Sequence, residues 1–199
     1  AMRERADYEN KAAALARITA STDYAVLEDA DLVIEAATEN VGIKLQIMRR
    51  VEELVAEHAV IASNTSSISI TQLAAALKRP ERFVGVHFFN PVPMMALVEV
   101  IRGLQTGDAA HGTCLDYAQA VGKTAITVKN SPGFVVNRIL CPMLNEAIFV
   151  LQEGLATAEE IDAGMKLGCN HPIGPLALAD LVGLDTLLAV LEVFYGDFK

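Results

Sequence analysis

The order of the predicted secondary structure constrains the fold of this chain more than any single motif. Through about residue 128, short apolar stretches typical of buried strands alternate with segments whose apolar residues recur at helical spacing. The expected strands are residues 29–37, 59–63, 82–89, 96–101 and 124–128, and the expected helices are residues 1–18, 39–58, 69–77 and 107–122. This alternation predicts a parallel sheet with helices on both faces.

The pattern changes after residue 128, where almost no strand signal remains. Helical patterns separated by glycine and proline cover residues 137–154, 157–168 and 175–196. We therefore place a domain boundary near residues 130–132. The predicted fold class is α/β, with a Rossmann-like doubly wound sheet in residues 1–130 followed by an all-α C-terminal domain in residues 131–199.

The sheet domain is expected to be partial. A dinucleotide-binding sheet opens with a strand, a glycine-rich GxGxxG turn and an acidic residue about twenty positions later. This sequence has no glycine before Gly42, and it ends at residues 197–199 without a clear helix C-cap. We expect the N-terminal part of the sheet domain to be missing and the helical domain to be incomplete.

Charge and composition exclude several classes of partner. The net charge of −9 and the lack of a basic run argue against a nucleic-acid partner. Polar residues or proline interrupt every long apolar stretch, and residues 1–11 lack the apolar segment of a signal peptide. We expect a soluble, cytoplasmic protein without a membrane partner. The three cysteines, Cys114, Cys141 and Cys169, lack ligand spacing, which indicates buried thiols and no metal site.

Polar residues follow three of the predicted strands, at the edge where ligands bind in open α/β sheets. Glu39 and Asn40 follow the first strand, residues 64–67 follow the second, and His87 and Asn90 lie at the end of the third. We expect these groups to converge along one edge. Two structural interpretations stay open: residues 64–67 also suit a turn and a helix N-cap, and Glu39 suits a helix N-terminus.

The segment HFFNPVPMMALVEV, residues 87–100, places a histidine and a carboxylate on two apolar stretches joined by a proline-rich bend. Burying an unpaired charge is costly, so Glu99 in the middle of a predicted strand needs a partner. If the two strands lie side by side, Glu99 can accept a hydrogen bond from His87, fix its tautomer and stabilise the imidazolium. The pair then acts as a general base, and a purely structural pair is the alternative.

The segment SPGFVVNR, residues 131–138, opens the helical part. Pro132 and Gly133 favour a turn, and Asn137 is an uncharged donor among apolar residues. Backbone groups at helix ends between the two domains could hydrogen-bond the side chain of Asn137. Alternatively, its amide could hold a substrate oxygen in the cleft between the domains.

Four segments in fixed order closely resemble the 3-hydroxyacyl-CoA dehydrogenase family, in particular its short-chain bacterial 3-hydroxybutyryl-CoA members. They are residues 63–67, 87–100, 131–138 and 165–185, and the resemblance covers nearly the whole chain from about Ala12. It implies NAD as cofactor, an acyl-CoA substrate, and reversible oxidation of an (S)-3-hydroxyacyl-CoA to the 3-oxoacyl-CoA. It also implies a homodimer that buries apolar faces of the helical domain.

The resemblance also implies a role for individual residues. His87 matches the family's base and Glu99 its partner carboxylate, while Ser66 and Asn137 match residues that hold the substrate oxygens. The positions that match cofactor contacts are Ala36, Glu39, Lys44, Ser66 and Asn90.

Two interpretations of Lys44 stay open. Its side chain could reach a phosphate of the cofactor or of CoA, or it could be a solvated helix lysine.

Two alternatives to an independent enzyme also stay open. The protein could be a catalytically silent relative that keeps the fold for binding or structure, or a module of a multifunctional β-oxidation protein. The intact set of Ser66, His87, Glu99 and Asn137 favours the enzyme, because a silent relative has no chemical need for a paired base.

Overall fold

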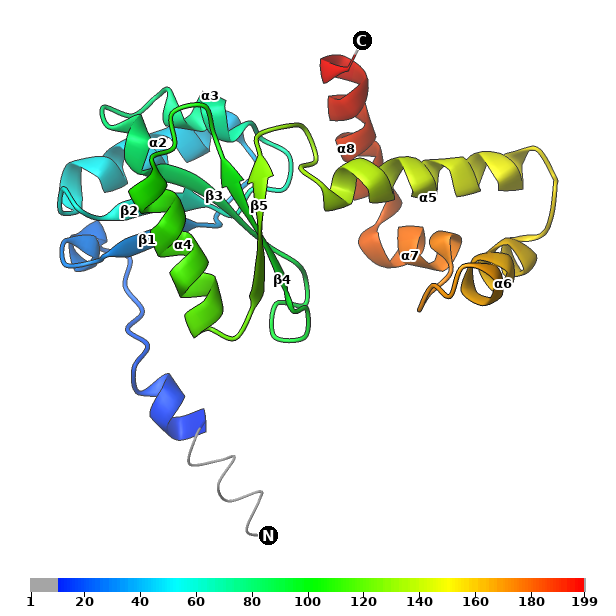
Figure 1. Ribbon diagram of the computed structural model, residues 1–199, viewed down its shortest axis with the longest axis horizontal. Coiled ribbons are helices and arrows are strands. Elements are labelled where there is room, and N and C mark those ends of the chain that lie inside the picture. The colour runs from blue at the N-terminus through cyan, green and yellow to red at the C-terminus, as the bar shows by residue number, and fades with distance from the viewer. Residues whose placement is uncertain (1–10, 199) are drawn as a thin grey trace, which may run out of the picture.

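Five strands form one sheet in the order β1-β2-β3-β4-β5, and a group of helices follows the sheet (Figure 1). The structure is a computed structural model that describes residues 11–198. The strands are β1 (Leu32–Glu35), β2 (Val60–Ser63), β3 (Phe83–Phe88), β4 (Leu97–Arg102) and β5 (Thr124–Lys129). The helices around the sheet are η1 (Tyr24–Leu27), α2 (Val41–Leu54), α3 (Ile70–Ala74), η2 (Pro80–Arg82) and α4 (Asp108–Ala120). The helix expected over residues 1–18 lies partly outside the described residues; residues 11–15 are helical.

The sheet is mostly parallel, as the alternation predicts, with one antiparallel pair. Strands β1, β2 and β3 are parallel, β4 runs antiparallel to β3, and β5 is parallel to β4. A parallel crossover needs about a dozen residues or more, and the bend at residues 89–96 is too short for one, so the chain turns back on itself. The resulting register places His87 directly opposite Glu99.

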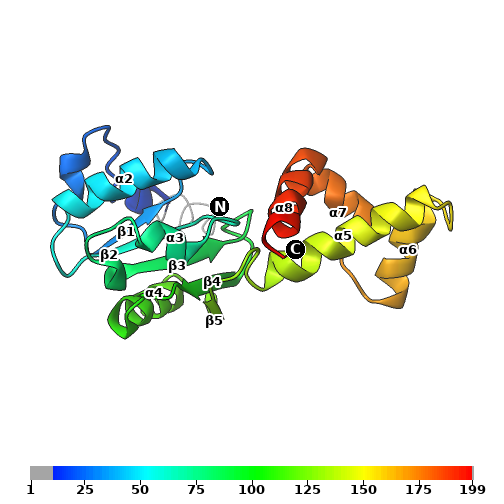
Figure 2. The same cartoon turned by 90° about the horizontal axis from the view of Figure 1, so that it is seen from above.

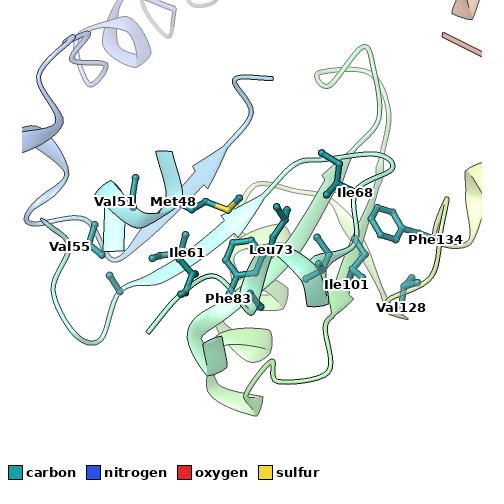
Figure 3. Packing of buried hydrophobic residues seen from close by; sticks show 14 residues of the cluster. Met48, Val51, Val55, Ile61, Ile68, Leu73, Phe83, Ile101, Val128 and Phe134 are labelled. Atoms are coloured by element: carbon teal, nitrogen blue, oxygen red, sulfur yellow. The ribbon is translucent and has the colours of Figure 1, made fainter. Parts of the chain in front are cut away.

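Helices cover both faces of this sheet, which confirms the doubly wound architecture (Figure 2). On one face, α2 and α3 pack over Ile61, Phe83 and Ile101 (Figure 3). On the other face, α4 packs against alternate valines of β3 and β4 through the small residues Ala110, Cys114 and Ala118. Burial of a large apolar side chain such as Phe83 contributes roughly 1.5–3 kcal/mol.

The helical part has an apolar cluster of its own. Its helices are α5 (Val136–Gln152), α6 (Ala158–Gly168), α7 (Pro175–Val182) and α8 (Leu184–Asp197). Leu144, Ala179 and Phe194 are among the buried residues that pack together between them. The single helical pattern over residues 175–196 is broken at Gly183, whose φ of 97° and ψ of 125° end α7. Apolar periodicity continues across this glycine, so the sequence pattern does not reveal the break.

None of the helices within residues 11–198 is long and apolar enough to cross a bilayer.

The cysteines differ in their exposure. Cys114 and Cys141 are buried, as expected, whereas Cys169 at the end of α6 is exposed, so the expectation of a buried thiol is wrong there. Burial raises the pKa of Cys114 to about 12 and also raises the pKa of Cys141. Since the thiolate is the reactive form, only Cys169 should react readily.

We expect iodoacetamide at about pH 8 to modify Cys169 of the native protein and to leave Cys114 and Cys141 unmodified, because burial disfavours their thiolates. Intact-mass spectrometry counts the labels, and protein unfolded in guanidinium serves as the fully labelled control. Rapid native labelling of Cys114 or Cys141 would contradict their burial.

Candidate active site

The histidine and glutamate predicted to pair are in contact. His87 Nδ1 lies 2.8 Å from Glu99 Oε2, and both side chains are buried, with Glu99 fully so. The imidazole also lies against the rings of Phe89 and Phe134, with centroids 4.6 and 5.6 Å away. Within residues 11–198 no group hydrogen-bonds Nε2. When Nδ1 carries the proton donated to Glu99, Nε2 is the nitrogen that can accept one.

The second oxygen of Glu99 contacts the start of helix α5. Glu99 Oε1 accepts hydrogen bonds from the backbone N–H groups of Val135 and Val136, at 3.0 and 3.1 Å. These are N-terminal donors that have no partner inside the helix, and the helix dipole favours an anion there. Asn137 is the next residue and is half-buried. Its side-chain amide has no hydrogen bond to residues 11–198. Glu99 therefore links the histidine to the helix that carries Asn137.

A tight turn brings these two amides to Glu99. Gly133 and Phe134 both have positive φ, 72° and 51°. A Cβ atom on Gly133 would lie 2.3 Å from the ring of Phe194, so the turn and helix α8 leave no room for a side chain. Gly154 has the same φ of 72°, but nothing lies within 4 Å of its Cβ position.

We expect Gly133→Ala to destabilise the protein more than Gly154→Ala, because both substitutions strain a left-handed residue but only the first also overpacks. The strain costs about 1 kcal/mol at each site, and the clash with Phe194 adds about 1–3 kcal/mol at Gly133. Urea unfolding of the two variants checks the difference. Equal losses of unfolding free energy would contradict the tight fit of the turn.

Three of the predicted cofactor residues line one cavity at the carboxyl edge of the sheet. The cavity has a volume of about 190 Å³. Its walls are Ala36, Ala37, Thr38, Glu39, Lys44 and Asn64. The first strand end, the start of α2 and the loop after β2 therefore meet at one place, as the order of the elements predicts.

Neither Ser66 nor Asn90 is among the residues of this wall, but Ser66 contacts one of them. The backbone N–H of Ser66 donates to Glu39 Oε1 at 3.2 Å, and the hydroxyl of Thr65 donates to Glu39 Oε2 at 2.7 Å. Glu39 thus binds the loop that carries Ser66, while the next residue, Asn40, caps α2. The side chain of Asn64 accepts a hydrogen bond from the amide of Phe88, at 2.9 Å, next to the catalytic candidate His87. Asn90 is exposed at the bend and has no hydrogen bond to residues 11–198.

Lys44 is buried, so the interpretation as a solvated helix lysine is wrong. Its side chain is 1% exposed, and Nζ lies 2.5 Å from Glu35 Oε2 and 3.4 Å from Ser63 Oγ. Glu35 also accepts hydrogen bonds from the Ser63 hydroxyl and the Ala37 amide. Burial alone would raise the pKa of Glu35, but the hydrogen bonds from Lys44, Ala37 and Ser63 outweigh it and the pKa lies below its usual value.

Comparison with known proteins identifies the family. Residues 1–131 match the NAD binding domain of 3-hydroxyacyl-CoA dehydrogenase, and residues 133–199 match the C-terminal domain. The chain belongs to the 3-hydroxyacyl-CoA dehydrogenase family.

Relatives of the chain carry names from this family. The 3-hydroxybutyryl-CoA dehydrogenase of Clostridioides difficile is 50% identical over 94% of this chain and 67% of its own length. The mitochondrial hydroxyacyl-coenzyme A dehydrogenase of Homo sapiens is 46% identical over 89% of this chain and 57% of its own length. A crystal structure of (S)-3-hydroxybutyryl-CoA dehydrogenase from Ralstonia eutropha is 64% identical, with a TM-score of 0.94, over 96% of this chain and 68% of that one. The chain thus spans about two thirds of its bacterial relatives.

Several contacts of this site were not predicted from the sequence. They involve Glu35, Ser63, Thr65 and the amides of Val135 and Val136. Glu35 could have been predicted from the sequence, because it shows the same signal as Glu99, a carboxylate in an apolar strand. The backbone amides carry no signal, because every residue except proline provides one.

Proposed function

We propose that the protein that contains this chain catalyses the reversible, NAD-dependent oxidation of an (S)-3-hydroxyacyl-CoA to the 3-oxoacyl-CoA. The short-chain substrate 3-hydroxybutyryl-CoA is proposed because the similar bacterial enzymes are named for it. The observation that supports the reaction most directly is the buried His87–Glu99 pair, in which Nδ1 is engaged and Nε2 remains available for a substrate proton.

In this proposal His87 Nε2 takes the proton of the substrate hydroxyl as the carbon–oxygen bond becomes a carbonyl. The negative charge of Glu99 stabilises the imidazolium that forms, and the amides of Val135 and Val136 hold the carboxylate in place. NAD, when bound, supplies the acceptor for the hydride that leaves the same carbon. In the reverse direction the protonated histidine polarises the ketone and returns the proton. Ser66 and Asn137 hold the substrate oxygens.

The carboxyl-edge cavity fits part of a dinucleotide. Lys44 provides hydrogen-bond donors and Glu39 provides an acceptor, while Ala36 and Ala37 leave room beside them. Donors and acceptors side by side suit a hydroxyl-bearing group such as a ribose. We propose that Ala36, Glu39, Lys44, Ser66 and Asn90 contact the cofactor.

We also propose that residues 1–130 form the cofactor domain, that residues 131–199 belong to the domain that completes the substrate cleft, and that the protein is cytoplasmic. The helical part exposes large apolar residues, among them Leu181, Leu184 and Leu188. Such residues are typical of an interface, and we propose that they lie in a homodimer.

Leu181→Asp and Leu188→Asp should shift the full-length protein from dimer to monomer, because each places a charge in an apolar contact. Size-exclusion chromatography with light scattering measures the mass. A wild-type monomer would contradict the dimer directly.

The reaction is tested with the full-length protein, acetoacetyl-CoA and NADH, following the absorbance of NADH. His87→Gln should lower kcat by about 100-fold or more, because the general base is lost. Glu99→Gln should lower kcat by about tenfold or more, because a neutral amide does not stabilise the imidazolium. Circular dichroism establishes that each variant is folded.

The surface pair His58–Asp31 is the matched control. His58 Nε2 lies 3.0 Å from Asp31 Oδ1, but both side chains are solvent-exposed. His58→Gln and Asp31→Asn should leave kcat unchanged. Full activity of either His87→Gln or Glu99→Gln would refute the proposed mechanism, and a wild-type protein that binds NADH without turnover would favour the catalytically silent relative.

A further inference from the structure

We infer that Glu35 and Ser63 are positioning residues that hold the ammonium of Lys44 at the wall of the carboxyl-edge cavity. Glu35 balances the charge of the ammonium, which then donates a hydrogen bond to an uncharged part of the cofactor. This inference rests on the proposed function, because it concerns how the same cavity would hold NAD. The resemblance to the family implies no role in the proposed reaction for Glu35 or Ser63.

The three groups come from different elements, and of the three only Lys44 lines the cavity. Glu35 ends β1 and Ser63 ends β2, and the register of the two parallel strands makes them direct neighbours. Lys44 lies in the first helical turn of α2. The Ser63 hydroxyl donates to Glu35 Oε2 at 2.9 Å and lies 3.4 Å from Lys44 Nζ, so all three side chains are joined.

Stability alone does not explain this buried pair. Removing a lysine and a glutamate from water is costly, and replacing such pairs by apolar residues is often neutral or stabilising. The side chains of the pair are nevertheless almost fully buried, with 1% of Lys44 and 3% of Glu35 exposed. Lys44 has three N–H donors, and Glu35 and Ser63 are its only partners within residues 11–198. One donor therefore remains for a ligand in the cavity that Lys44 lines.

The charges of the cavity favour an uncharged ligand group at Lys44. Glu35 is bonded to the ammonium, and Glu39 is the other acidic residue that the same cavity wall brings to this place. Two carboxylates and one ammonium leave a net negative charge, which disfavours a phosphate there. The expectation that Lys44 reaches a phosphate is thus replaced by a hydrogen bond to a neutral oxygen.

The test is a double-mutant cycle on NADH affinity in the full-length protein, with fluorescence of NADH as the signal. Glu35→Gln and Lys44→Met should each weaken NADH binding by about tenfold or more, because each disturbs a charge-assisted donor. The double variant should bind NADH no more weakly than Lys44→Met alone, since Glu35 acts through Lys44. Ser63→Ala should weaken binding by a smaller factor.

A second buried ion pair provides the control for a purely structural effect. Arg82 and Glu52 lie 3.8 Å apart, with side chains 8% and 6% exposed, and neither lines the cavity. Glu52→Gln should lower the melting temperature without changing the NADH affinity. If Glu35→Gln does not fold, Ser63→Ala decides the question, because Ser63 contacts both Lys44 and Glu35, and an unchanged NADH affinity in this variant would overturn the positioning role.

The outcomes separate the inference from the proposed function. Unchanged NADH affinity in Glu35→Gln, or losses that simply add in the double variant, would overturn the positioning role while NADH binding by the wild type persists. A wild-type protein that does not bind NADH at all would overturn the proposed function itself.

Discussion

The buried carboxylate of Glu99 is the interaction on which the rest of the site depends. An ionised group with no exposure to solvent is tolerated only when its oxygens are hydrogen-bonded, and both oxygens of Glu99 are. One oxygen orients His87, and the other binds the first amides of α5. The same charge thereby fixes the histidine and places the helix that carries Asn137. Removal of this carboxylate would disturb both parts of the site together.

Glu35 repeats this arrangement in the edge strand β1. Like Glu99, it lies in an apolar strand, pairs with a basic side chain from another element and also accepts a backbone N–H. Each carboxylate joins its strand to a neighbouring strand and to the start of a helix, α2 for Glu35 and α5 for Glu99. Buried charges are costly, so the two pairs lie where they orient groups for the proposed chemistry, with the apolar core packed around them.

Much of the fold and part of the site could be predicted from the sequence because their signals are local. The alternation of strand and helix patterns predicts the layers, and a carboxylate in ALVEVI requires a partner, which the bend supplies in His87. The remaining contacts could not be predicted, because they depend on which elements meet. The burial of Lys44 follows from the neighbouring ends of β1 and β2, and the break at Gly183 follows from a backbone angle that apolar periodicity does not reveal.

The antiparallel strand β4 makes the register of the sheet and the His87–Glu99 pair depend on each other. Residues opposite one another in β3 and β4 share a face, so His87 and Glu99 both point to the side of α2 and α3. A slip of one residue would turn Glu99 to the opposite face, among the apolar side chains of α4. There the charge would lack both the imidazole and the amides of α5, and the cost of burying it would oppose the slip. The carboxylate proposed to support catalysis therefore also selects the strand register that brings it to the histidine.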